Sequence, residues 1–121
     1  MLSGWMALLV CLCIQGYGLY TPTAPGPGGV PGLDKLGHLL AFGVPAALAW
    51  LLRARWLVVL LVLHALVSEP LQHALAPARQ MDPLDATANL LGIGLGVWIA
   101  ATALRRWGHS GDMLPTGAQE R

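Results

Sequence analysis

The chain has 121 residues, of which 55% are hydrophobic and only 11% are charged, and its mean hydropathy is +0.60. Soluble domains carry about 25% charged residues, so this composition excludes an ordinary soluble domain and a charged disordered tail. The formal net charge of +1 gives no basic field for nucleic acid, and we expect no nucleic-acid partner. What remains is a small integral membrane protein.

Four apolar stretches approach or reach the roughly 20 residues that a helix needs to cross about 30 Å of hydrocarbon. They predict an all-α fold, an integral membrane bundle of four transmembrane helices at about 4–20, 36–52, 56–71 and 83–104. These form one domain, 1–107, which is followed by a flexible cytoplasmic tail, 108–121. Because no positive charge precedes the first stretch, we expect a retained span rather than a cleaved signal peptide.

The arginines predict how the bundle is oriented. Arg53 and Arg55 separate the second and third spans. Arg105 and Arg106 follow the fourth, so with four spans all of these arginines share the side that receives both termini. Cytoplasmic loops are enriched in Lys and Arg. We therefore expect a multi-pass membrane protein, surrounded by membrane lipids, with both termini in the cytoplasm.

The opposite rim collects charges of both signs. Its ionisable residues are Asp34, Lys35, Glu69, Arg79, Asp82 and Asp85. Ionisable groups near membrane depth are costly, so they usually face a bundle interior or water and often mark function. The outer rim is therefore the candidate site.

Helical phase places some of these residues on shared faces. At about 100° per residue, one stripe of the fourth span runs from Asp82 and Asp85 through Asn89. The same stripe continues to Gly92 and Gly96. Two glycines four residues apart let a neighbouring helix approach closely, so we expect them to serve helix packing and the stripe to face protein.

The second and third spans each carry a polar face of their own. Asp34 and His38 share one face of the second span, and Lys35 lies on its flank. Glu69 and Gln72 lie one turn apart in the third span. All of these groups sit at the outward ends of their helices, so we expect them to meet.

Several of these residues also have a purely structural explanation. Asp82 stands before Pro83 as a good helix N-cap, and Asp85 in the first turn suits the helix dipole. Asp34 is placed to cap the second helix. Asn89 is equally explained as a hydrogen-bonding residue between helices.

We expect no cofactor and no metal. Glu69 and His73 are four residues apart, but the sequence holds neither an H-E-x-x-H pair nor a Cys/His ligand set. It also lacks a G-x-S-x-G elbow, a P-loop and a dinucleotide fingerprint. Among the histidines, His38 lies on a polar face and is a candidate for chemistry, whereas His64 is interpreted as a packing residue.

Taken in order, the polar residues form one pattern: Asp34-Lys35-x-x-His38-x-x-x-Phe42, Ser68-Glu69-x-x-Gln72, Arg79, and Asp82-x-x-Asp85-x-x-x-Asn89-x-x-Gly92-x-x-x-Gly96. The pattern covers Leu33 to Trp98 and resembles the VanZ-like family of small bacterial membrane proteins, from which only Pro70 departs. The resemblance implies a helical protein of the bacterial cytoplasmic (inner) membrane, in a family whose namesake contributes to resistance against teicoplanin and which has no established reaction. It implies a binding site made of Asp34, Lys35, His38, Glu69, Gln72, Arg79, Asp85 and Asn89.

Our leading hypothesis is that the outer rim binds or modifies a polar, phosphate-bearing or glycosylated group of a lipid-linked envelope precursor. Lys35 and Arg79 would supply cationic donors. Glu69, Asp85 and Asn89 would orient these donors or bind hydroxyls and amines. The ligand and the oligomeric state stay open.

Two alternatives belong to other classes of protein. In the first, an enzyme uses His38 with Glu69 or Asp85 for general acid and base catalysis on a lipid-linked phosphate or ester. In the second, the charged groups form an ion-pair network that only holds the bundle together. The catalytic residues are thus unknown, with these three as candidates.

Overall fold

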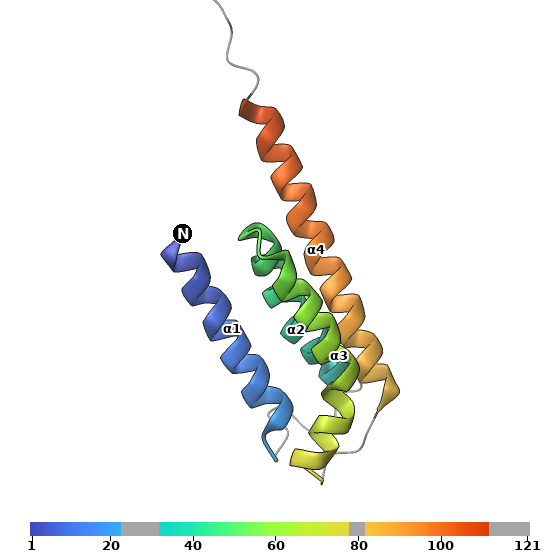
Figure 1. The fold of residues 1–121 in the computed structure, drawn as a ribbon. Coiled ribbons are helices and arrows are strands. Elements are labelled where there is room, and N and C mark those ends of the chain that lie inside the picture. The colour runs from blue at the N-terminus through green and yellow to red at the C-terminus, as the bar shows by residue number, and fades with distance from the viewer. Residues whose placement is uncertain (23–31, 78–81, 112–121) are drawn as a thin grey trace, which may run out of the picture.

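The computed structural model describes residues 1–22, 32–77 and 82–111, and within them the only regular elements are four helices (Figure 1). These are α1 (Leu2–Tyr20), α2 (Leu33–Leu51), α3 (Arg55–Leu75) and α4 (Pro83–Gly111). The prediction of an all-α chain with four helices is confirmed.

All four helices are longer than the expected spans: α1 and α2 begin two or three residues earlier, and α3 and α4 run well past their expected ends. We expected the third span to end at 71, but α3 continues through Pro70 to Leu75. Proline removes one backbone hydrogen bond, yet an apolar helix that satisfies its other backbone groups internally tolerates this loss. Similarly, α4 continues past Gly108 to Gly111, where we expected the tail to begin, because one glycine costs a helix only about 1 kcal/mol. The rest of the expected tail lies outside the described residues.

Three of the four helices, among the residues that the structure describes, are long and apolar enough to cross a membrane. They are α1, α3 over its whole length, and α4 from Pro83 to Gly108. The helix α2 is 19 residues long but falls outside this group. Its first turn holds Asp34 and Lys35, and these charges lower its mean hydropathy. The predicted fourth span therefore stays a prediction.

The helix α2 lies among the other three and packs most extensively on α4 (Figure 1). The two run parallel, since Lys35 meets Asp85 near their beginnings and Gly43 meets Gly96 further along. The helices α1 and α3 run the opposite way. The N-terminal ends of α2 and α4 therefore lie beside the C-terminal ends of α1 and α3.

A glycine seam made of Gly43, Gly92 and Gly96 joins α2 and α4. A Cβ atom built on Gly43 would lie 2.9 Å from the carbonyl oxygen of Gly92. Built on Gly92 or Gly96, it would overlap the backbone oxygen of Leu39 or Gly43 outright. The two backbones are thus in direct contact, and the seam fixes the register of one helix against the other.

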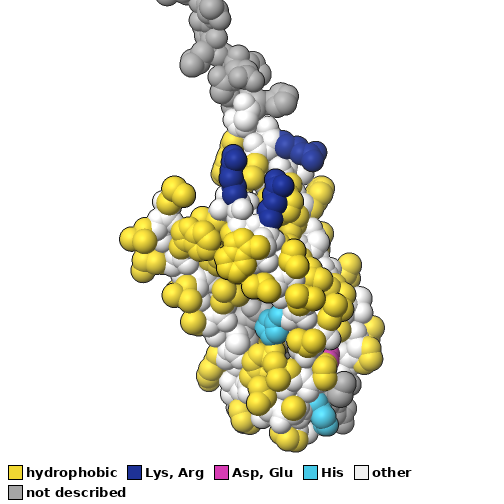
Figure 2. All heavy atoms as spheres, viewed as in Figure 1, with side chains coloured by type: hydrophobic (Ala, Val, Ile, Leu, Met, Phe, Trp, Pro, Cys, Tyr) yellow, Lys and Arg dark blue, Asp and Glu magenta, His cyan; other side chains and the backbone are white. Residues whose placement is uncertain are grey.

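The apolar core lies beside this seam and consists of Leu19, Phe42, Ala46, Leu61, Ala65 and Ile93. Large apolar side chains such as Leu63, Leu91 and Trp98 point outward instead and are more than half exposed. Figure 2 shows hydrophobic side chains over most of the visible face, with Lys and Arg gathered toward the end where α4 runs on. An outer surface of this kind suits contact with lipid rather than with water.

Candidate functional site

Polar side chains gather where α2 and α4 begin and α3 ends. We call this group the polar cluster, and it consists of Lys35, His38, Ser68, Glu69, Asp82, Asp85 and Asn89. The parallel packing of α2 on α4 brings their first turns together, and the antiparallel α3 delivers its last turns to the same place. Five of these residues, all but Lys35 and Asp82, are buried.

The ammonium group of Lys35 lies among three carboxylates. It donates to Asp82 Oδ2 at 2.5 Å, to Asp85 Oδ1 at 2.6 Å and to Asp34 Oδ2 at 3.1 Å. The hydrogen bonds to Asp82 and then Asp85 raise the pKa of Lys35, and the hydrogen bond from Lys35 lowers the pKa of Asp82. The Asp34 side chain is 61% exposed and marks the outer edge of the group. Lys35 thus balances the acidic start of α4.

A chain of hydrogen bonds with a fixed direction crosses the buried part of the cluster. Ser68 Oγ donates to the Ala65 carbonyl at 2.9 Å, so its oxygen is left to accept from Asn89 Nδ2 at 3.0 Å. The amide of Asn89 therefore presents Oδ1 to His38 Nδ1, 3.0 Å away. An amide oxygen only accepts, so Nδ1 must carry the proton and donate.

The direction of this chain decides what the other nitrogen of His38 does. With the proton on Nδ1, a neutral imidazole presents the lone pair of Nε2. That atom lies 3.4 Å from Asp85 Oδ2, which is itself an acceptor. Two acceptors that face each other need a proton or a cation between them. The geometry therefore creates a position that attracts positive charge.

Glu69 completes this position from the third helix. Its Oε2 accepts the backbone N–H of Asp82 at 3.1 Å, while its Oε1 is buried and has no hydrogen-bond partner among the described residues. One ligand atom each from His38, Glu69 and Asp85 lies within 4.8 Å of the other two. We call these three residues the buried triad.

The remaining predicted site residues have different places. Gln72 is buried, but its Nε2 donates to the Leu19 carbonyl at 2.7 Å and ties α3 to the end of α1. Arg79 lies outside the described residues. Asp82 accepts the N–H of Leu84 at 2.9 Å through Oδ1, which confirms its prediction as the N-cap of α4.

Sequence reasoning left two features of this region out. Ser68 was quoted in the motif but not as a site residue, although its hydroxyl sets the direction of the hydrogen bonds to His38. The metal prediction considered ligand spacing within one helix, whereas the buried triad takes one residue from each of three helices. In the sequence, the only indication of a group assembled in this way is that each of the three helices carries polar residues on one face.

A second histidine has a different setting. His64 Nε2 is hydrogen-bonded to the Tyr20 hydroxyl at 2.5 Å, and its ring centroid lies 5.2 Å from that of Phe42. These contacts match the packing role expected for His64.

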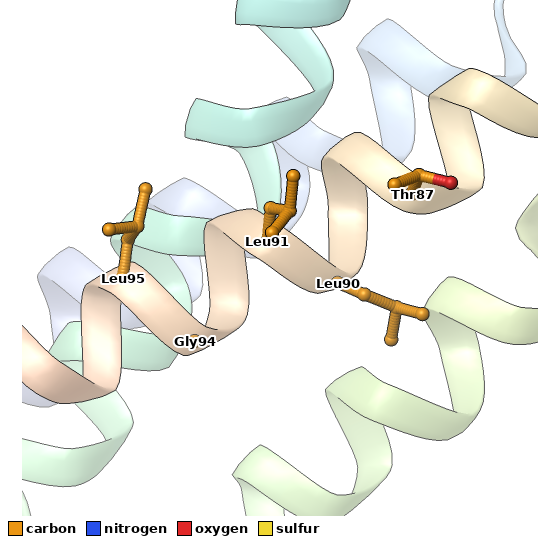
Figure 3. Close-up of a pocket in the computed structure, with 5 residues that line it drawn as sticks. All are labelled: Thr87, Leu90, Leu91, Gly94 and Leu95. Atoms are coloured by element: carbon orange, nitrogen blue, oxygen red, sulfur yellow. The ribbon is translucent and has the colours of Figure 1, made fainter.

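An apolar groove on α4 is lined by Thr87, Leu90, Leu91, Gly94 and Leu95 (Figure 3), and none of these residues belongs to the polar cluster. It holds no charged group.

Searches for relatives give no match for this chain among family models, curated proteins or solved structures. The functional argument therefore rests on the geometry of the polar cluster.

Proposed function

We propose that this chain is a four-span, VanZ-like protein of the bacterial inner membrane whose polar cluster binds the polar head of a lipid-linked cell-envelope group. The observation that carries the proposal is the polar cluster itself. Buried carboxylates, an imidazole and an amide converge at one end of an otherwise apolar bundle. Ionisable groups in that position are energetically costly, so where they occur they usually serve binding or chemistry.

The charge of the cluster favours one kind of head group. Among the described residues, Lys35 is the only Lys or Arg beside the carboxylates of Asp34, Glu69, Asp82 and Asp85. A surplus of acceptors favours hydroxyls and amines, as a sugar or an amino sugar presents them, over a bare phosphate. A glycosylated head group is therefore the better fit.

The proposed topology puts the cluster at the outer face. Arg53 and Arg55 lie at the opposite end of the bundle, and Arg105 and Arg106 lie near the end of α4. Enrichment of Arg on the cytoplasmic side then supports cytoplasmic termini. Single cysteines at Gly28 and Arg55, in a chain with Cys11 and Cys13 replaced by serine, should label from opposite sides. Labelling of both from one side would contradict four spans.

The binding proposal is tested on purified protein in detergent micelles. Native mass spectrometry should find envelope lipids with sugar head groups on the wild type and markedly fewer on Asp85→Asn. Arg105→Gln, which removes a charge near the other end of the bundle, is the matched control and should keep them. Equal lipid retention by wild type and Asp85→Asn, with both proteins folded, would contradict the proposal.

A shift of teicoplanin susceptibility in an expressing host, lost with Lys35→Glu, would link the site to the role that the resemblance implies.

An enzymatic role is the second candidate, favoured by the 3.4 Å approach of His38 Nε2 to Asp85 Oδ2. In this version His38 moves a proton through Nε2 to or from a lipid-linked ester or phosphate, Asn89 orients the ring through Nδ1, and Asp85 stabilises the protonated ring. Turnover of an envelope lipid by the wild type, abolished in His38→Gln, would favour this version. Binding with no product over a broad lipid panel would favour binding alone.

A further inference from the structure

The buried triad has the chemical composition of a metal-binding site. It offers one imidazole nitrogen and two carboxylates, and all three residues are buried. Imidazole suits zinc, iron, copper and nickel, and carboxylates complete the ligand set in many zinc sites. We propose that His38, Glu69 and Asp85 bind one divalent transition-metal ion, such as Zn²⁺, at the outer end of the bundle.

Each residue of the triad is held through an atom that a metal does not need. His38 donates from Nδ1 to Asn89, which leaves Nε2 as the ligand atom. Lys35 holds Asp85 through Oδ1 and leaves Oδ2. Metal-binding histidines usually donate their second N–H to a carbonyl or carboxylate, and ligating carboxylates are themselves hydrogen-bonded. The surroundings of the triad follow this arrangement.

Glu69 supplies a second and independent observation. The residue is only 6% exposed, and its Oε1 has no donor among the described residues. Its Oε2 is held by the backbone N–H of Asp82. A buried carboxylate oxygen without a partner is costly, more so beside the second carboxylate of Asp85, and a bound cation removes this cost.

The distances require little movement. Nε2 of His38 and Oδ2 of Asp85 are 3.4 Å apart, close to the separation of two ligands on one tetrahedral zinc ion. No two ligand atoms of the triad are more than 4.8 Å apart. Two ligands at about 2.1 Å from one tetrahedral ion lie about 3.4 Å apart, so a side-chain rotation that moves the Glu69 carboxylate by roughly 1–1.5 Å closes the site.

Zinc binding is tested on the full chain, carrying a purification tag without histidine, in detergent micelles after treatment with a chelator. Isothermal titration with ZnSO₄ should give one ion per chain. Two conservative variants preserve the shape of the side chain, Glu69→Gln and Asp85→Asn. Each should weaken zinc binding by about 10-fold to 100-fold. His64→Gln removes a histidine outside the triad and should bind zinc like the wild type.

Cobalt provides a readout that does not depend on any variant. Co²⁺ added to the wild type should give visible absorption bands of a tetrahedral or five-coordinate nitrogen and oxygen site, which Zn²⁺ then displaces. The proposal is overturned if the wild type binds no ion at one equivalent, or if Glu69→Gln and Asp85→Asn bind zinc unchanged. These titrations contain no lipid, so a failure to bind zinc or cobalt would overturn the metal site without bearing on the proposed lipid binding.

Discussion

The interface between α2 and α4 has two regions built in opposite ways. At the glycine seam, backbone lies against backbone and no side chain intervenes. At the polar cluster, the same two helices are joined by charged and amide side chains. The seam provides close packing and fixes the register of the two helices. The cluster buries ionisable groups at a depth where their desolvation costs free energy. From this difference we expect the seam to hold the fold, and we propose that the buried triad within the cluster serves binding.

The largest expected effect comes from filling the seam. Gly96→Ala places a methyl group against the Gly43 carbonyl, so the two helices must separate. We expect a loss of about 2–3 kcal/mol or more in the free energy of unfolding, measured by denaturation in mixed micelles. Gly94→Ala is the matched control, because a Cβ atom there meets nothing within 4 Å. It should be neutral or slightly stabilising, and equal losses from both changes would remove the special role of the seam.

The next effect comes from breaking the buried hydrogen-bond chain. Asn89→Ala leaves Ser68 and His38 without their shared partner. Buried polar groups that lose a partner cost about 1–3 kcal/mol, so the free energy of unfolding should fall by roughly 2 kcal/mol. Thr87→Ala, in the same helix but exposed, should change it by less than about 0.5 kcal/mol. If Asn89→Ala lowers the free energy of unfolding as little as Thr87→Ala does, the hydrogen-bond chain does not hold His38 in place.

Lys35→Met should have a smaller effect, on the order of 1 kcal/mol, because the ion pairs of Lys35 are partly exposed. The variant should also bind Zn²⁺ more weakly than the wild type, because Lys35 no longer holds Asp85 through Oδ1. Calorimetric titration of the metal-free variant with ZnSO₄ checks this expectation. Zinc binding as tight as that of the wild type by a folded Lys35→Met protein would show that Lys35 does not position Asp85 for the ion.

The smallest effect is expected at the outer edge of the cluster. The Asp34 side chain is largely exposed and contacts Lys35 at 3.1 Å, so Asp34→Asn should change stability by less than about 0.5 kcal/mol. Thermal denaturation of this variant beside Lys35→Met measures the gradient from the rim to the interior. A loss for Asp34→Asn as large as that for Lys35→Met would contradict this gradient.

The sequence predicts the elements of this protein better than the contacts between them. Apolar length and helical phase are local properties, so the four helices and the polar stripe of α4 follow from the residues alone. The continuation of α3 beyond Pro70 does not follow from the residues alone, because a proline in a sequence usually predicts the end of a helix. The fourth span stays a proposal for a similar reason, since α2 is not apolar enough by itself.

The buried triad shows where sequence reasoning ends. His38, Glu69 and Asp85 come from three helices, and their meeting depends on how far each helix is shifted along the next. Between α2 and α4 that shift is set by the close approach at the glycine seam. Phase alone placed Asp34 on the polar face with His38 and Lys35 only on the flank of that face, whereas the packing of α2 on α4 directs Lys35 to Asp85 and leaves Asp34 exposed.

The central claim is that the buried triad is kept for binding and not for stability, and Glu69→Gln tests it most directly. Glutamine keeps the shape of the side chain and an oxygen that accepts the Asp82 N–H, but it removes a buried charge with an unpartnered oxygen. In chelator-treated protein, the free energy of unfolding of Glu69→Gln should equal or exceed that of the wild type. A loss of more than about 2 kcal/mol would instead assign Glu69 to an ion-pair network that holds the bundle together.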